Sequence, residues 1–299
     1  MPVLSLGLTL GEGDANVTIG PIGGDPIIDG VYKLEDDSGF YLTAANDYLA
    51  FETAETALWT PTRISTLSWY DISDNSTITE AGGVVTNIAD KSGNGISLTA
   101  NSASTNNHTL LSASQNGLDV VDLDGDDRYN ATSAITVPSG NASFFIVCKV
   151  DTIDNSLDSI LATTGTNSFQ YQSSSTTDFL ARLTGPNATT STTNTDYKGA
   201  YHIFNASFDF DGGNYESIVD GAVEGSVSYT SQLSTTLNLR VFTNRGQSAY
   251  PAGQLAEIVI CTDVSTTTRQ KIEGYLAHKW GIDGNLDSSH PYALGAPTI

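Results

Sequence analysis

The stretch AYHIFNASFDFDGGNYESIVDGAVEGSVSYT, residues 200 to 230, decides the fold class. It contains three runs in which apolar and polar residues alternate, as they do in β-strands with one buried face. DGG and then DG separate the runs, and such pairs supply the positive φ angles that tight hairpin turns require. The stretch therefore predicts a three-stranded antiparallel meander.

Other β-branched and aromatic runs predict further strands on both sides of this meander. Ser- and Thr-rich clusters such as SSSTTD (173 to 178) separate the runs, as loops do in an all-β protein. The predicted strands are LSWYDI (67 to 72), LDVVDLD (118 to 124), SFFIVCKV (143 to 150), DSILAT (158 to 163), FLARLT (179 to 184), LNLRVFT (237 to 243) and QLAEIVI (254 to 260). Many short antiparallel strands favour a two-sheet sandwich over a βαβ architecture.

One helix is predicted near the end of the chain, over residues 266 to 280. Four large side chains recur there at three- and four-residue spacing, which gives one apolar stripe that can lie against the sandwich. They are Ile272, Tyr275, Leu276 and Trp280. Hydroxyl side chains at 265 to 268 can cap the start, and Gly281 stands where a helix often ends in a left-handed residue.

Residues 1 to 60 differ from the rest and predict a separate Gly-rich arm. GVYKLEDDSGFYLTA, from residue 30, is typical of one hairpin that turns at DDSG. Such a segment is too small for a core of its own, so we expect it to dock onto the main domain, sister subunits or a larger assembly. TPTR (60 to 63) is interpreted as a linker, and residues 61 to 299 as the main domain.

The charge of the chain excludes one class of function. Its 34 acidic and 12 basic residues give a formal net charge of -22, and the basic residues are scattered along the sequence. Nucleic-acid binding needs clustered Lys and Arg to neutralise phosphates, so no nucleic-acid partner is expected. We interpret the charge as a solvated acidic exterior.

Neither a membrane-spanning segment nor a secretory signal is expected. No apolar run is long enough to cross a bilayer, and the first residues lack the basic region of a signal peptide. By alternation Cys148 shares a buried face with Phe144 and Ile146, while Cys261 is expected to face outward. Two free thiols are therefore favoured over a bridge, which suits folding in a reducing cytoplasm.

The motif DLDGDDRY contains the one candidate metal site. Asp122, Asp124, Asp126 and Asp127 fall within six residues, and carboxylate oxygens at this density can hold calcium. The alternative interpretation is a solvent-facing turn between strands, because no glutamate closes an EF-hand loop.

Motifs for catalysis are missing from the sequence. The paired carboxylates of glycoside hydrolases on similar folds, written E-x-D-x-x-E, do not occur, nor does a Gly-x-Ser-x-Gly turn. The four histidines, His108, His202, His278 and His290, have no metal-like spacing. We therefore expect a protein that is not an enzyme and needs no cofactor apart from the candidate calcium. Sugar binding is the other possible site chemistry, and the loops at 101 to 116 and 173 to 196 are where it is expected.

Four motifs together carry a family resemblance over roughly residues 64 to 294. They are LSWYDISDNSTIT (67 to 79), GGVVTNIADKSGNGISLTA (82 to 100), NGLDVVDLDGDDRY (116 to 129) and RQKIEGYLAHKWGIDGNLDSSHPY (269 to 292). The chain resembles laminin-G-like, concanavalin A-like jelly rolls of the kind found in tailed-bacteriophage virion structural proteins. MPVLSLGLTL and YKLEDDSGFYL are similar to openings seen on virion proteins of tailed phages.

The resemblance implies an all-β jelly-roll sandwich and a structural role on the virion surface. Under this hypothesis residues 1 to 60 attach to capsid or tail subunits, the chain is a homo-oligomer assembled in the host cytoplasm, and the jelly roll is displayed outward. It could then be a capsid decoration protein, a head fibre or a tail-associated protein, with a possible host-surface glycan as ligand. The alternatives are a bacterial surface or secreted glycan-binding module and, third, a polysaccharide-degrading enzyme.

Overall fold

The computed structural model describes residues 57–102, 107–138, 140–154, 157–165, 167–173, 179–183, 196–228 and 233–299, together with two short strands nearer the start of the chain. These strands, β1 (Tyr32–Lys33) and β2 (Tyr41–Leu42), belong to a separate unit, Met1–Ala57. They pair antiparallel with Tyr32 opposite Leu42, which is the pairing of the predicted hairpin. The rest of the predicted arm lies outside the described residues.

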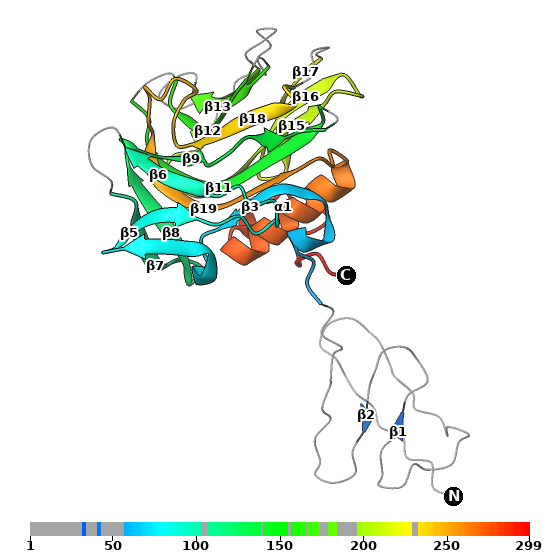
Figure 1. Ribbon diagram of the computed structural model, residues 1–299. Helices are drawn as coiled ribbons and strands as arrows, with labels where there is room; N and C mark the ends of the chain where they lie inside the picture. The colour runs from blue at the N-terminus through cyan, green and yellow to red at the C-terminus, as the bar shows by residue number, and fades with distance from the viewer. Residues whose placement is uncertain are drawn as a thin grey trace, which may run out of the picture. The chain divides into compact units, whose positions relative to one another are not determined.

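The second unit, Leu58–Ile299, is a sandwich of two antiparallel sheets (Figure 1). Sheet A has the order β17-β16-β15-β11-β19, and the free edge of β19 pairs with β3 along one half and with β8 along the other; β7 lies outside β8. Its strands are β3 (Thr66–Asp71), β7 (Thr109–Gln115), β8 (Leu118–Asp124), β11 (Ala142–Thr152), β15 (Tyr201–Asp209), β16 (Asn214–Val219), β17 (Ala222–Ser228) and β19 (Ala252–Cys261).

Sheet B is built around β18 in the same way. One edge of β18 leads through β12 and β13 to β14, and the other pairs with β10 and with β9, beyond which lie β6, β5 and β4. Its strands are β4 (Ile78–Ala81), β5 (Val84–Ile88), β6 (Leu98–Ser102), β9 (Asp127–Ala131), β10 (Ile135–Thr136), β12 (Ser159–Thr164), β13 (Phe169–Ser173), β14 (Phe179–Leu183) and β18 (Thr236–Val241). The predicted two-sheet sandwich is confirmed.

The three-stranded meander is confirmed as β15, β16 and β17. Its second turn has two residues at positive φ, Asp220 at 49° and Gly221 at 83°, as the sequence DG predicts. Each of the other predicted strands is present close to its expected bounds. The strands that were not predicted, β4 to β7, β9, β10 and β13, lie between those that were.

Two apolar layers hold the unit together, one between the sheets and one between sheet A and the helix. Successive residues of β11 alternate between them: Phe144, Ile146 and Cys148 face the inter-sheet core, whereas Phe145 and Val147 face the helix. Cys148 is therefore buried as predicted. Cys261 lies in the helix-side layer and is also buried, which corrects the prediction that it faces outward, because the helix covers that face. Both thiols are free.

The predicted helix is confirmed as α1 (Thr266–Trp280). The Ser265 hydroxyl accepts a hydrogen bond from the Thr268 amide, and Gly281 ends the helix at a φ of 64°. Ile272, Leu276 and Trp280 are fully buried against sheet A. No helix in the described part of the chain has the length and apolar character to cross a membrane.

The jelly-roll unit begins before TPTR, so this motif is not a linker. Trp59 is buried in the helix-side layer, and its amide donates to the Pro297 carbonyl near the other end of the chain. Pro61–Arg63 then forms a short 3-10 helix, η1, in which Pro61 is buried. The sequence TPTR is typical of a loop, but the buried side chains of Trp59 and Pro61 make it part of the folded unit.

Gly274 of α1 is expected to tolerate no side chain. A Cβ atom there would lie 2.6 Å from Cβ and 2.8 Å from Cγ of Tyr292, in the segment that follows the helix. Alanine normally stabilises a helix relative to glycine by about 1 kcal/mol. Here we expect Gly274→Ala to lower the free energy of unfolding by roughly 1–3 kcal/mol, because the packed ring must move.

Urea unfolding of the variant measures this effect. Thr267→Ala, at an exposed position of the same helix, is the control and should change stability by less than about 0.5 kcal/mol. A Gly274→Ala protein that is more stable than the wild type would contradict the close contact with Tyr292.

Candidate functional site

A buried carboxylate joins the helix to sheet A. Glu257 of β19 has no exposed surface, and its two oxygens accept four hydrogen bonds. Oε1 accepts from Trp69 Nε1 at 2.7 Å and from the Tyr275 hydroxyl at 2.9 Å, and Oε2 accepts from Lys279 Nζ at 2.7 Å and Trp280 Nε1 at 2.8 Å. Because all four partners donate, the carboxyl group acts only as an acceptor, as the ionised form does.

Two lysines extend this network across the end of β3. Lys279 Nζ also lies 2.7 Å from Asp71 Oδ1, and Lys91 Nζ lies 2.8 Å from Asp71 Oδ2 and from Asp74 Oδ2. Burial raises the pKa of Glu257, and Lys279 opposes that rise. Burial also acts to raise the pKa of Asp71, but the two lysines hold it below its usual value.

The motifs that carried the family resemblance meet at this network. Trp69 and Asp71 come from the first motif, Lys91 from the second, and Lys279 from the fourth. Asn116, from the third motif, donates a hydrogen bond to the carbonyl of Lys279 at the end of the helix. These residues therefore bind the helix to the sandwich, and their role in the described structure is to hold the fold.

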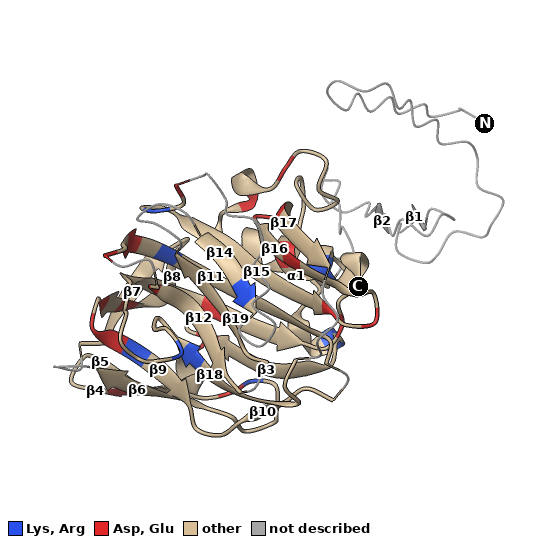
Figure 2. Ribbon diagram, turned by 90° about the horizontal axis from the view of Figure 1, so that it is seen from above, with Lys and Arg blue, Asp and Glu red and all other residues tan. Residues whose placement is uncertain are grey.

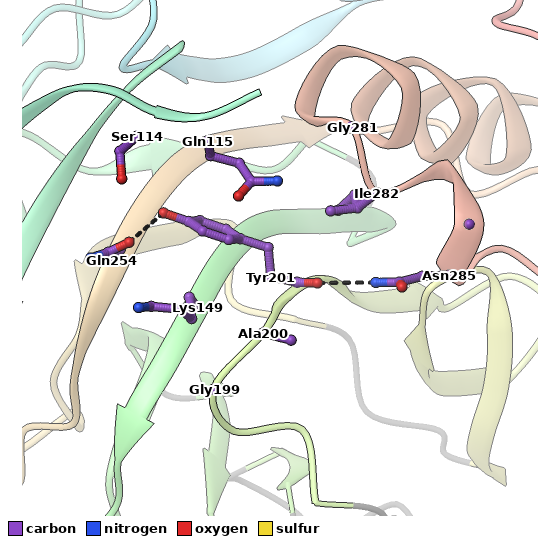
Figure 3. Close-up of a pocket in the computed structure, with 11 residues that line it drawn as sticks. Ser114, Gln115, Lys149, Gly199, Ala200, Tyr201, Gln254, Gly281, Ile282 and Asn285 are labelled. Atoms are coloured by element: carbon purple, nitrogen blue, oxygen red, sulfur yellow. Dashed lines mark hydrogen bonds between the residues drawn. The ribbon is translucent and has the colours of Figure 1, made fainter. Parts of the chain in front are cut away.

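A pocket of about 540 Å³ lies beyond the C-terminal end of the helix, on the same face of sheet A (Figure 3). Its lining is mostly polar or glycine, and it comes from β7, β11, β15, β19 and the segment after α1. The lining residues are Ser114, Gln115, Lys149, Gly199, Ala200, Tyr201, Gln254, Gly281, Ile282, Gly284 and Asn285. This is the volume of a site for a small organic ligand.

Strand register builds the polar floor of this pocket. Tyr201 on β15 stands opposite Lys149 on β11, Lys149 stands opposite Gln254 on β19, and Gln254 stands opposite Asp122 on β8. Side chains of one row point to one face of a sheet, here the face that carries Phe145 and Val147 under the helix. The row lies where the cover of the helix ends: Lys149 and Gln254 are half-buried there, and Tyr201 is 8% exposed.

Hydrogen bonds fix the orientation of these groups. The Tyr201 hydroxyl donates to Gln254 Oε1 at 2.6 Å, and Gln254 Nε2 donates to Asp122 Oδ1 at 3.1 Å. Asn285 Nδ2 donates to the Tyr201 carbonyl at 3.0 Å. Figure 3 shows the Tyr201 ring between this bond and the bond from its hydroxyl to Gln254. Burial raises the pKa of Tyr201 further above neutral pH. An aromatic ring framed by amides, a hydroxyl and an ammonium group suits a ligand rich in hydroxyls.

The sequence predicts this pocket only in part. The loop expected at 101 to 116 contributes Ser114 and Gln115, but the strand residues Lys149, Tyr201 and Gln254 were not predicted. Most of the second expected loop, 173 to 196, lies outside the described residues. Lys149 is the residue that could have indicated the pocket from sequence, because it is a charged residue on the same face of SFFIVCKV as Phe145 and Val147.

Three of the four predicted calcium ligands are brought together. Oxygens of Asp124, Asp126 and Asp127 lie within 4.8 Å of one another, whereas Asp122 is bonded to Gln254. Asp127 is fully buried, and its Oδ2 has no hydrogen-bond partner among the described residues. Burial raises the pKa of Asp127, and the neighbouring His108 opposes that rise.

Calcium binding to this turn remains a prediction. Calorimetric titration of the protein with calcium chloride at millimolar concentration is expected to give heat that is lost in Asp124→Asn. Asp263→Asn, which alters an exposed aspartate at the start of α1, is the control. A titration without heat would contradict the calcium assignment and favour the plain turn.

The four histidines each have a local partner. His278 Nε2 lies 2.8 Å from the Tyr292 carbonyl, and His290 Nε2 lies 3.1 Å from Oε2 of the buried Glu273. His202 Nδ1 lies 2.6 Å from Asp220 Oδ2, and His108 Nε2 lies 2.9 Å from the Arg128 carbonyl. These contacts hold loops and strands in place.

Comparisons with known proteins find solved structures of similar fold but no family for this chain. No family model matches the chain, and no curated protein matches it. Among solved structures, it is similar to domain 4 of an extracellular GH43 arabinanase from Geobacillus stearothermophilus in complex with arabinotriose, with a TM-score of 0.50 and 12% identity over 68% of this chain and 95% of that one. This likeness agrees with the jelly-roll sandwich.

Two further solved structures are less similar. The binding domain of botulinum neurotoxin DC in complex with SialylT has a TM-score of 0.49 and 9% identity over 71% of this chain and 52% of that one. An arabinofuranosidase complexed with arabinofuranosyl-alpha-1,2-xylobiose has a TM-score of 0.49 and 12% identity over 73% and 60%. The chain therefore spans about half the length of the neurotoxin domain.

Proposed function

We propose that this chain is a non-enzymatic glycan-binding protein and that the Tyr201 pocket holds the sugar. The observation that carries the proposal is the row formed by Tyr201, Lys149 and Gln254, which places one aromatic ring and several fixed hydrogen-bonding groups around one opening. Sugar recognition uses this combination, because the ring packs on the apolar face of the sugar while amides and hydroxyls bond its rim. The arabinotriose complex of the similar domain adds support for the ligand class.

A second and more specific proposal concerns the assembly in which the protein acts. We propose a structural protein of a tailed-phage virion, attached through residues 1 to 60 to capsid or tail subunits, which displays the jelly roll for adhesion to a host-surface glycan. The motif resemblance supports this role, as does the separate N-terminal unit, Met1–Ala57. A bacterial surface module would bind glycans in the same way but would be found on cells. Labelled antibodies against the jelly roll that mark cells and not phage particles would favour that alternative.

Filling the pocket tests the glycan proposal without disturbing the core. Gly284 lines the pocket, and a Cβ atom there meets nothing within 4 Å. Gly295 is equally open but does not line the pocket, so it provides a matched control. A glutamine side chain at 284 is expected to occupy space that the sugar needs.

Calorimetric titration of the wild type and the two variants with the glycan that binds best measures the effect. We expect Gly284→Gln to weaken binding at least about tenfold, which corresponds to about 1.4 kcal/mol, and Gly295→Gln to bind as the wild type does. Equal affinities of all three proteins would place the glycan elsewhere and refute the pocket assignment.

A further inference from the structure

The outer face of sheet B carries three arginines of this acidic chain, Arg128, Arg182 and Arg240, and the loop after β18 carries a fourth, Arg245. Leu239 and Val241 on β18 point into the inter-sheet core, as do Ala181 and Leu183 on β14. Because side chains alternate along a strand, Arg240 and Arg182 point away from the core. Figure 2 shows basic segments on the neighbouring strands β9 and β18.

Strand register places two of these arginines, Arg240 and Arg182, along one line. Asn130, Arg240, Ala162, Gln170 and Arg182 stand opposite one another on five adjacent strands, β9, β18, β12, β13 and β14. Strands lie about 4.8 Å apart, so the backbones at Arg240 and Arg182 are separated by roughly 14 Å. The small Ala162 and the amide of Gln170 lie between them.

The loop that follows β18 adds a third arginine to the middle of this line. The Arg245 amide donates to Gln170 Oε1 at 2.8 Å, and the Arg240 guanidinium donates to the Arg245 carbonyl. Phe242 and Gln247 bound the loop, each at a φ of 55°, in the left-handed region that non-glycine residues seldom adopt. A local conformation of this kind persists only where the surrounding structure enforces it, so the loop has a defined shape.

No carboxylate among the described residues balances the positive charge of this face. Within the described residues, none of the four arginines forms an ion pair, although the chain has 34 acidic side chains. Arg128 is held by neutral groups instead: Nε donates to Gln247 Oε1 at 2.8 Å, and the guanidinium lies 5.2 Å from the centre of the Tyr250 ring. Burial lowers the pKa of Arg240, and the charges of Arg128 and Arg245 lower it further.

Unused hydrogen-bond donors accompany this charge. Arg128 Nη1 and Arg182 Nε are buried without a hydrogen-bond partner in the described part of the chain. A guanidinium group presents its N–H groups in a planar fork that matches a carboxylate. The Gln170 side chain between the arginines is buried, and both ends of its amide are used within the protein: Oε1 accepts from the Arg245 amide and Nε2 donates to Gln172 Oε1 at 3.0 Å. Guanidinium groups spaced across adjacent strands therefore match a polymer that carries carboxylates at intervals.

We propose that the outer face of sheet B binds an acidic glycan, a saccharide chain with carboxylate groups, along the line from Arg240 to Arg182. The inference rests on the proposed function only in taking a glycan as the ligand. Its residues are separate from those of the Tyr201 pocket, so either site can fail without the other.

The test is a titration of the full chain with an oligogalacturonate, with a neutral galactan fragment of the same length as comparison. We expect the acidic probe to bind and each of Arg182→Gln and Arg240→Gln to weaken it at least tenfold. Arg63→Gln removes the same charge from an exposed site in η1 and should bind as the wild type does, as should Gly284→Gln. Circular dichroism melting confirms that each variant is folded.

Four results would overturn the proposal. They are absence of oligogalacturonate binding by the wild type at millimolar concentration, equal binding of the neutral fragment, unchanged affinity in both arginine variants, and binding of a single-stranded DNA of matched charge as tight as that of the oligogalacturonate. The last result would make the face a general polyanion surface. Failure of Gly284→Gln to affect the best neutral glycan, with both arginine effects present, would refute the pocket alone.

Discussion

Glu257→Leu is expected to lower the free energy of unfolding by about 3–5 kcal/mol, the usual effect of removing one partner from a buried ion pair. The substitution leaves the indole N–H groups of Trp69 and Trp280 and the Tyr275 hydroxyl without their acceptor. Lys279 keeps Asp71 but loses its buried partner. The helix would then lie on sheet A without its polar anchor.

Urea denaturation followed by tryptophan fluorescence measures this loss. Glu80→Leu makes the same change at an exposed position and should alter stability by less than about 1 kcal/mol. Adding Lys279→Met to Glu257→Leu should cost less than the sum of the two single changes, because the cation and its partner leave together. A Glu257→Leu protein within about 1 kcal/mol of the wild type would refute the anchoring role.

Gly253→Ala is expected to cost about 3 kcal/mol or more, because a side chain there has no room between β19 and β11. Its Cβ atom would lie far inside the contact distance of the Lys149 carbonyl oxygen and 3.0 Å from Val150 Cα. Both neighbours are backbone atoms of the central strand pair, so neither can move without breaking the ladder. The register is irregular beside this glycine, between Val147 and Cys148 and between Val150 and Thr152.

The same substitution should weaken glycan binding, since Gly253 lies next to Gln254 and opposite the strand that carries Lys149. Thermal melting and the calorimetric titration, performed on one preparation, separate the two effects. Gly295→Ala, where a Cβ atom meets nothing, is the control for both. A variant of wild-type stability would contradict the close approach of the two strands.

The fold was largely predictable because local patterns agree with it. The meander at 200 to 230 has alternation and turn residues that permit one topology, and α1 has a cap, an apolar stripe and a terminal glycine. Cys261 was expected to face outward, but it is buried in the layer under the helix. A strand pattern indicates which residues share a face, and it does not indicate what covers that face.

The candidate sites were less predictable because they depend on strand register. Tyr201, Lys149 and Gln254 are far apart in the sequence and meet only through the pairing of β15, β11 and β19. Arg240 and Arg182 are also far apart in the sequence, and they come into line only through the pairing of β18, β12, β13 and β14. Asp124, Asp126 and Asp127, by contrast, were found from sequence because they lie in one turn.

A glycan array probed with the full chain tests the central claim most directly. The account predicts selective binding to at least one glycan and loss of that binding in Gly284→Gln, Arg240→Gln or both, according to whether the sugar is neutral or acidic. An array without any signal, at protein concentrations that detect millimolar affinity through multivalent display, would contradict a glycan-binding role for this jelly roll.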